Sequence, residues 1–332
     1  MSDSQAAAQQ VEPLPQEIAL QTKPKLNRLT YDGRVKKLYG IWLLNFFMKI
    51  ITIGIYSFWG KTRMRKYIAS SFLLGGDRFE YTGTGKELFK GFLKASPILI
   101  AIYVPFIVSS SFAGESAVWP FIFLMPFIYV VPMAIFLALR YRMSRTTWRG
   151  IRGALSGSAV GYANLSIKRS FISFVSLGVF IPYSDIARHK YMVDHAYFGS
   201  IKADFRSSAK SLMKIHIITF LLMIPTLGFS RFWYRAALTR AKMNGLKVGD
   251  LNFRNNVTAW DMLKNISLNL LIVLLTLGLG TPFAINRNMK FMARHNAIAG
   301  DLETSQVMQA KDRKPSIGEG LDDIMGLDGG FM

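Results

Sequence analysis

The amino-acid sequence predicts a mainly α-helical membrane protein, built from repeated broken-helix units with short β-hairpins between them. Three observations lead to this prediction: uncharged apolar segments, an interruption motif that recurs along the chain, and short stretches in which apolar and polar residues alternate. The composition agrees, because the 332 residues are 51% hydrophobic and carry a formal net charge of +21. Nucleic-acid-binding proteins are often basic but seldom this apolar, whereas membrane proteins with basic cytoplasmic loops are commonly both, so we expect no nucleic-acid partner.

Two apolar segments are long enough to cross a bilayer. Neither stretch carries a charge: the first reads SPILIAIYVPFIVSSSFAG and the second WPFIFLMPFIYVVPMAIFLAL. The connection between them holds one acidic residue. Each stretch is close to the roughly 20 residues that a membrane helix needs. Their prolines are tolerated in membrane helices when neighbouring groups satisfy the freed carbonyls. We therefore expect a transmembrane hairpin over residues 94–140. Four other apolar segments, near 40–59, 160–182, 212–233 and 262–284, are shorter or contain polar residues.

These four segments share an interruption motif. It reads TIGIYSFWG from residue 52, SLGVFIPYS from 176, TLGFSRFWY from 226 and TLGLGTPFA from 276, so the last three copies begin 50 residues apart. A fixed period of this length marks one structural unit that is used repeatedly. Because glycine suits the left-handed conformation that ends a helix, each copy predicts a helix break. The candidate helix-break tips are Thr52, Gly54, Ser176, Gly178, Thr226, Gly228, Thr276 and Gly278.

The repeats define a domain organisation. We expect a disordered N-terminal tail over residues 1–28, a multi-pass membrane domain over 29–300, and an acidic disordered tail over 301–332. The membrane domain contains four repeat units, about 29–80, 150–200, 201–250 and 251–300, and the transmembrane hairpin is inserted between the first two. Alternating stretches such as FEYTGTG and LNFRNN predict strands or hairpins outside the membrane, which could pair with one another because isolated hairpins are marginal in water.

The helix that follows each interruption mixes basic with apolar residues, so its cations are expected at the membrane surface. This pattern predicts the lipid bilayer as a partner, with a preference for anionic phospholipids, and it is compatible with a homo-oligomer. The candidate lipid-headgroup contacts are Trp59, Lys61, Arg63, Arg65, Lys66, Arg188, Lys190, Trp233, Arg235, Arg240, Arg287 and Lys290.

Polar residues within the apolar arms have two interpretations. The candidate intramembrane residues are Asn45, Lys49, Asn265 and Asn269, and Asn164 lies beside another arm. Burying such groups in lipid is costly. They either line a polar path or join neighbouring helices by hydrogen bonds, and both interpretations stay open.

The distribution of charge favours one topology. Residues 140–170 hold seven basic and no acidic residues, whereas the turn at 113–118 holds no basic residue. Because basic connections stay in the cytoplasm, we expect only the hairpin 94–140 to cross, with four re-entrant units that enter and leave from the cytoplasm and with cytoplasmic termini. Six alternating spans are the alternative topology, in which several basic connections would face outward.

The residue pattern predicts no catalytic, cofactor-binding or metal site, so we do not expect an enzyme. The chain has no cysteine, which excludes thiol chemistry and Cys-ligated metals. His189, Asp194 and His195 are close in sequence, but their spacings do not place them on one helical face. The stretch GTGKE at residues 83–87 lacks the leading Gly and the final Ser or Thr of a phosphate loop, and it predicts a hairpin turn that runs into a helix.

Two short patterns resemble a known family. The first consists of Phe79, Gly83, Glu87, Leu88 and Phe89, and the second of Thr52, Gly54, Ile55, Tyr56, Trp59, Lys61 and Arg63, with Ile53 and Phe58 departing from its usual Leu and Pro. These residues resemble the YjgN-like family of bacterial inner-membrane proteins, whose function is unknown, over roughly residues 29–300. The resemblance implies a multi-pass protein of the inner membrane and supplies no catalytic residues.

Two functions follow from these features. Internal repetition, broken helices and polar residues at membrane depth are typical of transporters, so the first is a transporter or channel for a small or lipid-like solute. The dense basic surface favours the alternative, a non-transporting membrane organiser or scaffold that binds anionic lipids or a protein partner.

Overall fold

A computed structural model of the chain describes residues 26–112 and 119–302, and in these ranges one element order recurs five times. Each unit consists of a strand, two helices and a second strand. The first unit comprises β1 (Leu26–Tyr31), α1 (Val35–Ile51), α2 (Ser57–Ser70) and β2 (Phe72–Leu74). The second comprises β3 (Asp77–Tyr81), α3 (Gly85–Ser111), the 3-10 helix η2 (Trp119–Leu124), α4 (Met125–Arg145) and β4 (Thr146–Trp148).

The remaining three units span residues 151–198, 201–248 and 251–299. The third comprises β5 (Ile151–Leu155), α5 (Ala159–Val175), α6 (Ile181–Asp194) and β6 (Ala196–Phe198). The fourth comprises β7 (Ile201–Phe205), α7 (Lys210–Leu221), α8 (Arg231–Asn244) and β8 (Leu246–Val248). The fifth comprises β9 (Leu251–Asn255), α9 (Ala259–Leu275), α10 (Thr281–His295) and β10 (Asn296–Ala299). The segment that the sequence sets apart as an inserted hairpin is thus another copy of the same unit, with longer helices. The two predicted tails lie almost entirely outside the described residues.

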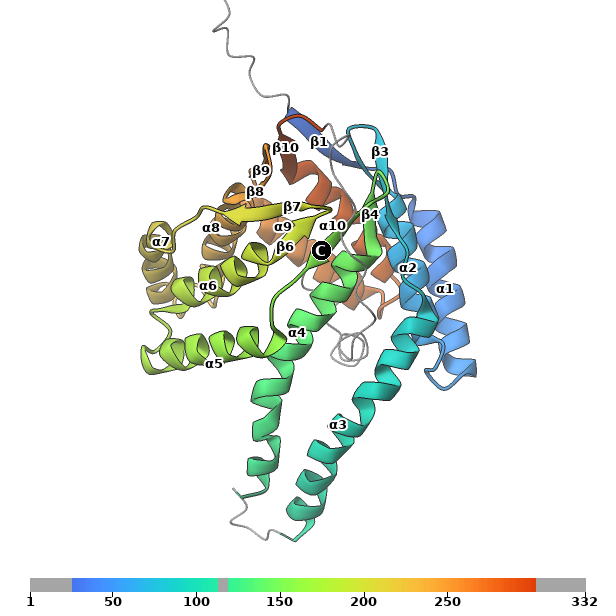
Figure 1. The fold of residues 1–332 in the computed structure, drawn as a ribbon, viewed down its shortest axis with the longest axis vertical. Coiled ribbons are helices and arrows are strands. Elements are labelled where there is room, and N and C mark those ends of the chain that lie inside the picture. The colour runs from blue at the N-terminus through green and yellow to red at the C-terminus, as the bar shows by residue number, and fades with distance from the viewer. Residues whose placement is uncertain (1–25, 113–118, 303–332) are drawn as a thin grey trace, which may run out of the picture.

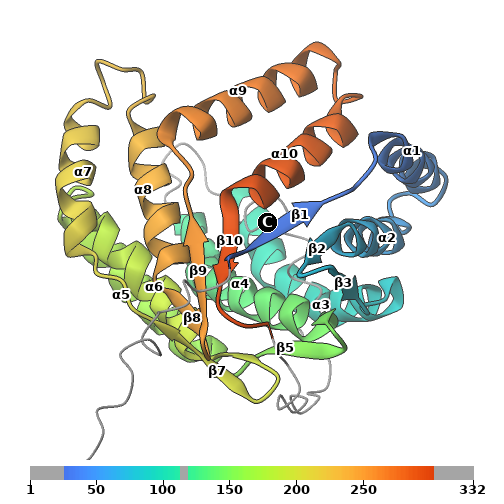
Figure 2. The same ribbon diagram turned by 90° about the horizontal axis from the view of Figure 1, so that it is seen from above.

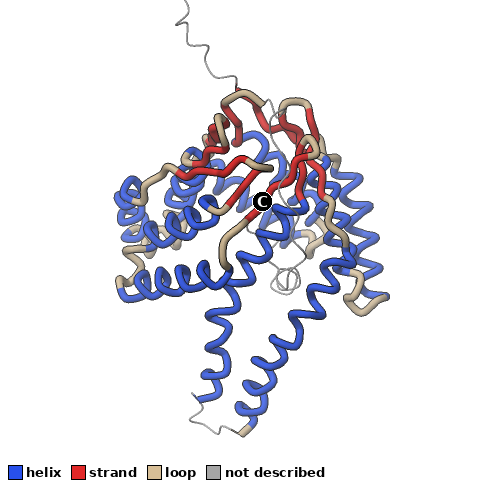
Figure 3. The backbone as a smooth tube through the Cα atoms, viewed as in Figure 1, coloured by secondary structure: helices blue, strands red, loops and turns tan. Residues whose placement is uncertain are grey.

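The strands form a single closed barrel, so the predicted fold class, in which short β-hairpins lie between the helical units, is wrong in its β part. All neighbouring strands pair antiparallel in chain order, and β1 closes the ring against β10 with Leu26 opposite Ala299. The reason is that each short hairpin leaves two unpaired edges, and every edge finds a partner only when the ring is complete. Figures 2 and 3 show the strands gathered together, with helices around them and on one side.

The antiparallel order places every helical hairpin at the same end of the barrel. Strands of consecutive units are joined by tight turns, such as Gly75–Gly76 with φ of 61° and 92°, and two positive φ values are typical of two-residue hairpin turns. The two strands within a unit are joined through its helices. The barrel therefore has a turn end and a helix end, and in Figure 1 α3 and α4 run farthest from the strands.

An apolar cluster fills the turn end of the barrel. Leu74 and Trp148 are 3% and 4% exposed, and each directly precedes a strand turn. They pack with Ile298 and Leu302, and against this cluster lie Leu29, Phe79, Phe198, Leu251 and Phe253. The core that holds the ten strands together is thus the interior of the barrel, whereas the helical hairpins extend outward from it.

The interruption motif forms the same tip in four units. The glycine at its third position has a positive φ, between 84° and 91°. Its N–H donates to the carbonyl five residues earlier, at 2.7 Å for Gly54, Gly178 and Gly228 and at 2.8 Å for Gly278, which is the longer hydrogen bond of a Schellman-type helix end. The first residue accepts a hydrogen bond from the N–H four residues later, for example Tyr56 N to Thr52 Oγ1 at 2.9 Å.

Each tip glycine is therefore required for its backbone conformation. We expect Gly228→Ala to lower the free energy of unfolding by about 1–2 kcal/mol, because its φ of +84° is strained for a residue with a Cβ although nothing lies within 4 Å. Gly40 in α1 also has no neighbour within 4 Å but no positive φ, so Gly40→Ala should stabilise by about 0.5–1 kcal/mol. Thermal unfolding in detergent measures both, and an unchanged midpoint for Gly228→Ala would show that the tip does not need glycine.

Candidate membrane interface and barrel cavity

The most exposed apolar side chains lie at the four tips. The second residue of the motif is Ile53, Leu177, Leu227 or Leu277, and these side chains are 93%, 83%, 89% and 93% exposed. Each has a φ of 49° or 50°, a left-handed conformation that is uncommon for an apolar residue. This position is apolar in every copy of the motif, but no sequence pattern marked it as exposed.

The exposed apolar surface continues along the first helix of each unit. These side chains lie in the half of the helix that leads to the tip: Phe47, Ile50 and Ile51 of α1, Phe171, Phe174 and Val175 of α5, Ile217, Ile218 and Leu221 of α7, and Leu271, Leu274 and Leu275 of α9. Burying one such side chain is worth about 1.5–3 kcal/mol. Contiguous apolar surface of this extent marks a membrane or a protein contact.

The predicted headgroup contacts lie on the second helices, which lead from the tip back to the barrel. Trp59, Arg63, Lys66, Lys190, Trp233, Arg235 and Lys290 are exposed, whereas Lys61, Arg188, Arg240 and Arg287 are half-buried. Arg188 forms an ion pair with Asp185 of its own helix at 3.0 Å. Arg65 is buried, with 5% exposure, so it does not lie on the membrane-facing surface and instead lines a cavity.

The predicted intramembrane asparagines join helices. Asn45 Nδ2 donates to the Gly60 carbonyl at 3.0 Å, which ties α1 to α2. Asn265 Nδ2 donates to Asn288 Oδ1 at 2.9 Å, which ties α9 to α10, and Asn269 Nδ2 lies 3.5 Å from Asn265 Oδ1. Lys49 is exposed near the tip of α1. These contacts favour interhelical hydrogen bonding over a polar path.

Two serines have the same role and were missed by the sequence analysis. Ser184 Oγ donates to the Arg169 carbonyl at 2.9 Å, and Ser230 Oγ donates to the Thr219 carbonyl at 2.7 Å. They join α5 to α6 and α7 to the start of α8. Asn164, beside the third unit's apolar arm, accepts a hydrogen bond from the hydroxyl of Tyr129 in α4, so it links two units.

The histidines do not form a metal site. Within the described ranges, no three His, Cys, Asp or Glu side chains are grouped closely enough to hold an ion. His216, which is fully buried, places Nε2 3.0 Å from the Gly178 carbonyl and so ties α7 to the tip of the preceding unit. Burial, together with the charge of Lys242, lowers the pKa of His189 to about 4, so this ring is neutral at neutral pH.

The stretch at residues 83–87 connects a strand to a helix. Thr84 Oγ1 accepts a hydrogen bond from the Glu87 N–H at 3.3 Å at the start of α3. Glu87 Oε2 accepts from Tyr141 Oη at 3.0 Å and from Arg145 Nε at 3.1 Å. Glu87 therefore joins α3 to α4 at the barrel, and the neighbouring Leu88 is fully buried. The stretch is thus a helix start, and no phosphate-binding loop is formed.

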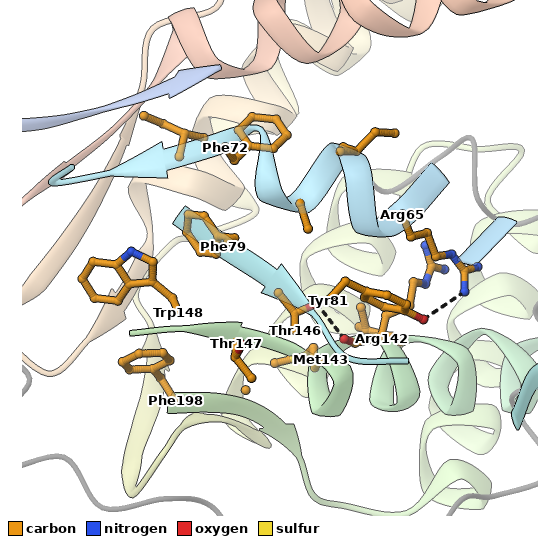
Figure 4. Close-up of a pocket in the computed structure, with 15 residues that line it drawn as sticks. Arg65, Phe72, Phe79, Tyr81, Arg142, Met143, Thr146, Thr147, Trp148 and Phe198 are labelled. Atoms are coloured by element: carbon orange, nitrogen blue, oxygen red, sulfur yellow. Dashed lines mark hydrogen bonds between the residues drawn. The ribbon is translucent and has the colours of Figure 1, made fainter. Parts of the chain in front are cut away.

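A cavity of about 430 Å³ lies inside the barrel between the aromatic cluster and the last turns of α2 and α4. Its wall is mostly apolar and comes from the first three units: Leu29, Arg65, Ile68, Ala69, Phe72, Phe79, Tyr81, Leu139, Arg142, Met143, Thr146, Thr147, Trp148, Gly153 and Phe198. Figure 4 shows the aromatic rings of Phe79, Trp148 and Phe198 at one end and the two arginines at the other. No sequence pattern indicated this site, because its residues are scattered over many elements.

Comparison with known proteins gives a family and a relative that matches part of the chain. A family model of bacterial proteins of unknown function (DUF898) matches residues 26–232 and 217–324. The inner membrane protein YjgN of Salmonella typhimurium is 29% identical over 125 residues, which cover 37% of this chain and 30% of that protein. The similarity thus extends over less than a third of that relative's length. No solved structure matches the chain.

Proposed function

The chain belongs to the bacterial protein family DUF898, and on this premise we propose that it organises anionic lipids on the cytoplasmic side of the inner membrane. It is an inner-membrane protein, in agreement with the location of its relative. Of the helices that the structure describes, two are long and apolar enough to cross a bilayer, Gly85–Ser111 and Phe121–Arg145. We infer that this pair crosses and anchors the protein, while the other four hairpins enter the bilayer from the cytoplasm and return.

The observation that carries the proposal is that all five hairpins leave the barrel at one end. Helix α1 has 17 residues and so is about 25 Å long, which is less than the roughly 30 Å of the hydrocarbon core. Helix α3 has 27 residues and reaches about 40 Å. Six alternating spans would require paired strands of one barrel to lie on opposite sides of the membrane, so the ring of strands favours re-entry.

The arrangement of side chains within each hairpin suits a lipid surface. The tip and the first helix expose apolar side chains, whereas the second helix exposes cations such as Lys66 and Lys290. In Figure 1 the apolar helix α5 lies below α6, in the direction in which α3 and α4 extend away from the strands. The apolar surface can therefore contact acyl chains while the cations contact anionic headgroups, each worth about 1 kcal/mol near the membrane surface.

Transport of a lipid-like solute is the second candidate function. The observation that favours it is the apolar cavity inside the barrel, which is large enough for a ligand. A channel along the barrel axis is not favoured, because Trp148, Ile298 and Leu302 pack together at the turn end. The asparagines that could have lined a pore are hydrogen-bonded to neighbouring groups in the hairpins.

Sidedness tests the topology. Single cysteines replace Glu115 in the connection between α3 and α4, Ser200 in the turn between β6 and β7, and Asp250 in the turn between β8 and β9; the chain has no cysteine of its own. In intact cells, a membrane-impermeant thiol reagent should label only position 115, because basic connections are hard to translocate. Permeabilised cells should be labelled at all three positions. Labelling of position 200 or 250 in intact cells would rule out a cytoplasmic barrel.

Lipid preference tests the basic surface. We expect added anionic phospholipid to raise the unfolding temperature of the detergent-solubilised protein more than neutral phospholipid does. The double variant Lys66→Glu and Lys290→Glu should lose most of this difference, because two cations worth about 1 kcal/mol each are reversed. The matched control Lys202→Glu and Arg254→Glu reverses two exposed cations of the barrel and should keep it. An equal loss in both variants would mean that the effect is one of net charge alone.

A further inference from the structure

We propose that the barrel cavity binds an amphiphile with one apolar chain and one anionic head, and that Arg65 and Arg142 contact the head. The inference goes beyond the lipid-organising function, because it concerns an interior site and does not depend on how the four short hairpins meet the membrane. A carboxylate or a phosphate monoester supplies the required head, so a free fatty acid and a single-chain phosphate share the chemistry.

The size of the cavity suits one chain. Its volume of about 430 Å³ lies in the range of roughly 300–1,000 Å³ that is typical of small-molecule sites. A cavity of this size accommodates one medium-length chain with its head.

The chemistry of the wall is divided between its two ends. One end is aromatic, with Phe79 and Phe198 placed 6.2 Å and 6.1 Å from Trp148 between ring centroids. Ile68 and Met143 extend the apolar wall between the ends. A ligand that fills this space must present an apolar surface, since a polar group there would lose its hydrogen bonds to water.

The other end is cationic. Arg65 is 5% exposed and its Nη1 lies 3.4 Å from the Tyr81 hydroxyl. Arg142 lies on α4, and in Figure 4 both arginine side chains extend toward the Tyr81 hydroxyl. Among the residues that the structure describes, those that line the cavity include these two arginines and no Asp or Glu. Because the guanidinium group is always charged and presents paired donors, two of them recognise a carboxylate or phosphate.

Helix α4 connects the cavity to the bilayer. Leu139, Arg142 and Met143 in its last turns line the cavity, and the preceding part of the same helix belongs to a candidate membrane span. The cavity thus lies at the membrane-facing, helix end of the barrel, whereas the turn end is filled by the aromatic cluster. This position favours a ligand that comes from the membrane and enters with its chain toward the aromatic end.

Quenching of tryptophan fluorescence tests the site. The full chain, purified in an uncharged detergent, is titrated with brominated single-chain probes of equal length that carry a carboxylate, a phosphate monoester or a hydroxyl. We expect saturable quenching by an anionic probe, at least tenfold weaker binding of the alcohol, and loss of most quenching in Trp148→Phe, since Trp148 lies at the cavity floor. The ratio of carboxylate to phosphate affinity identifies the preferred head.

Charge-neutral variants provide the decisive comparison. Arg65→Gln and Arg142→Gln should each weaken anionic-probe binding at least tenfold and leave alcohol binding unchanged, whereas Arg254→Gln, an exposed position on β9 outside the cavity lining, should bind like the parent protein. Equal binding by Arg65→Gln and the parent, or equal binding of all three probes, would overturn the proposal.

A cavity-filling variant serves if an arginine variant does not remain monodisperse. Ala69→Phe fills the cavity without a change of charge and should abolish binding of every probe. Retained binding in this variant would also overturn the proposal. A failed sidedness test with positive quenching would refute the membrane arrangement and leave the cavity site intact.

Discussion

Closure of the strand ring is the constraint on which the rest of the structure depends. The strands are only three to six residues long, and an isolated pair of this length is marginal in water. Pairing β1 with β10 gives every strand two neighbours and leaves no open edge. Because all pairs are antiparallel and follow chain order, helices α1–α10 all leave the barrel at one end.

This one-sided arrangement explains the unusual composition of the hairpins. A hairpin that begins and ends at the barrel must reverse within a short distance, and the Thr or Ser and Gly of the motif supply the hydrogen bonds and the positive φ for that turn. The apolar residue between them is then 83–93% exposed. Exposing these apolar side chains is unfavourable in water and favourable in lipid. The fold therefore presents the surface that the proposed membrane contact needs.

The sequence predicted the units and their tips but could not predict how the units assemble. The 50-residue period of the last three copies and the Thr/Ser–x–Gly pattern coincide with helix ends in the structure, because hydrogen bonds within a few residues determine a helix end. The barrel depends on pairing between residues as distant as Leu26 and Ala299, for which strands of three to six residues carry no local signal. The second unit was missed as a repeat because α3 and α4 are longer and lack the motif.

The candidate site residues also differ in whether local sequence or distant packing determines their environment. The exposed cations of the second helices could be predicted, because basic residues recur at fixed distances from each tip. Arg65 was misassigned to the surface, since nothing in the local sequence distinguishes it from Arg63 and Lys66, and only the packing of α2 on the barrel places it in the cavity. The asparagines were recognised as buried polar groups, but their partners, such as Gly60 and Asn288, depend on how the two arms align.

The depth of the tips in the bilayer is the direct test of re-entrant membrane contact. An environment-sensitive fluorophore is attached to a single cysteine at Leu227 or Leu277 in the liposome-reconstituted protein, with Lys202 on the barrel and Ile107 within α3 as references. Lipids with a quencher at a defined acyl-chain position then report depth. We expect both tips to be quenched by acyl-chain quenchers as position 107 is, whereas position 202 should be quenched only from the aqueous phase. Tip probes that behave like position 202 would contradict re-entrant membrane contact.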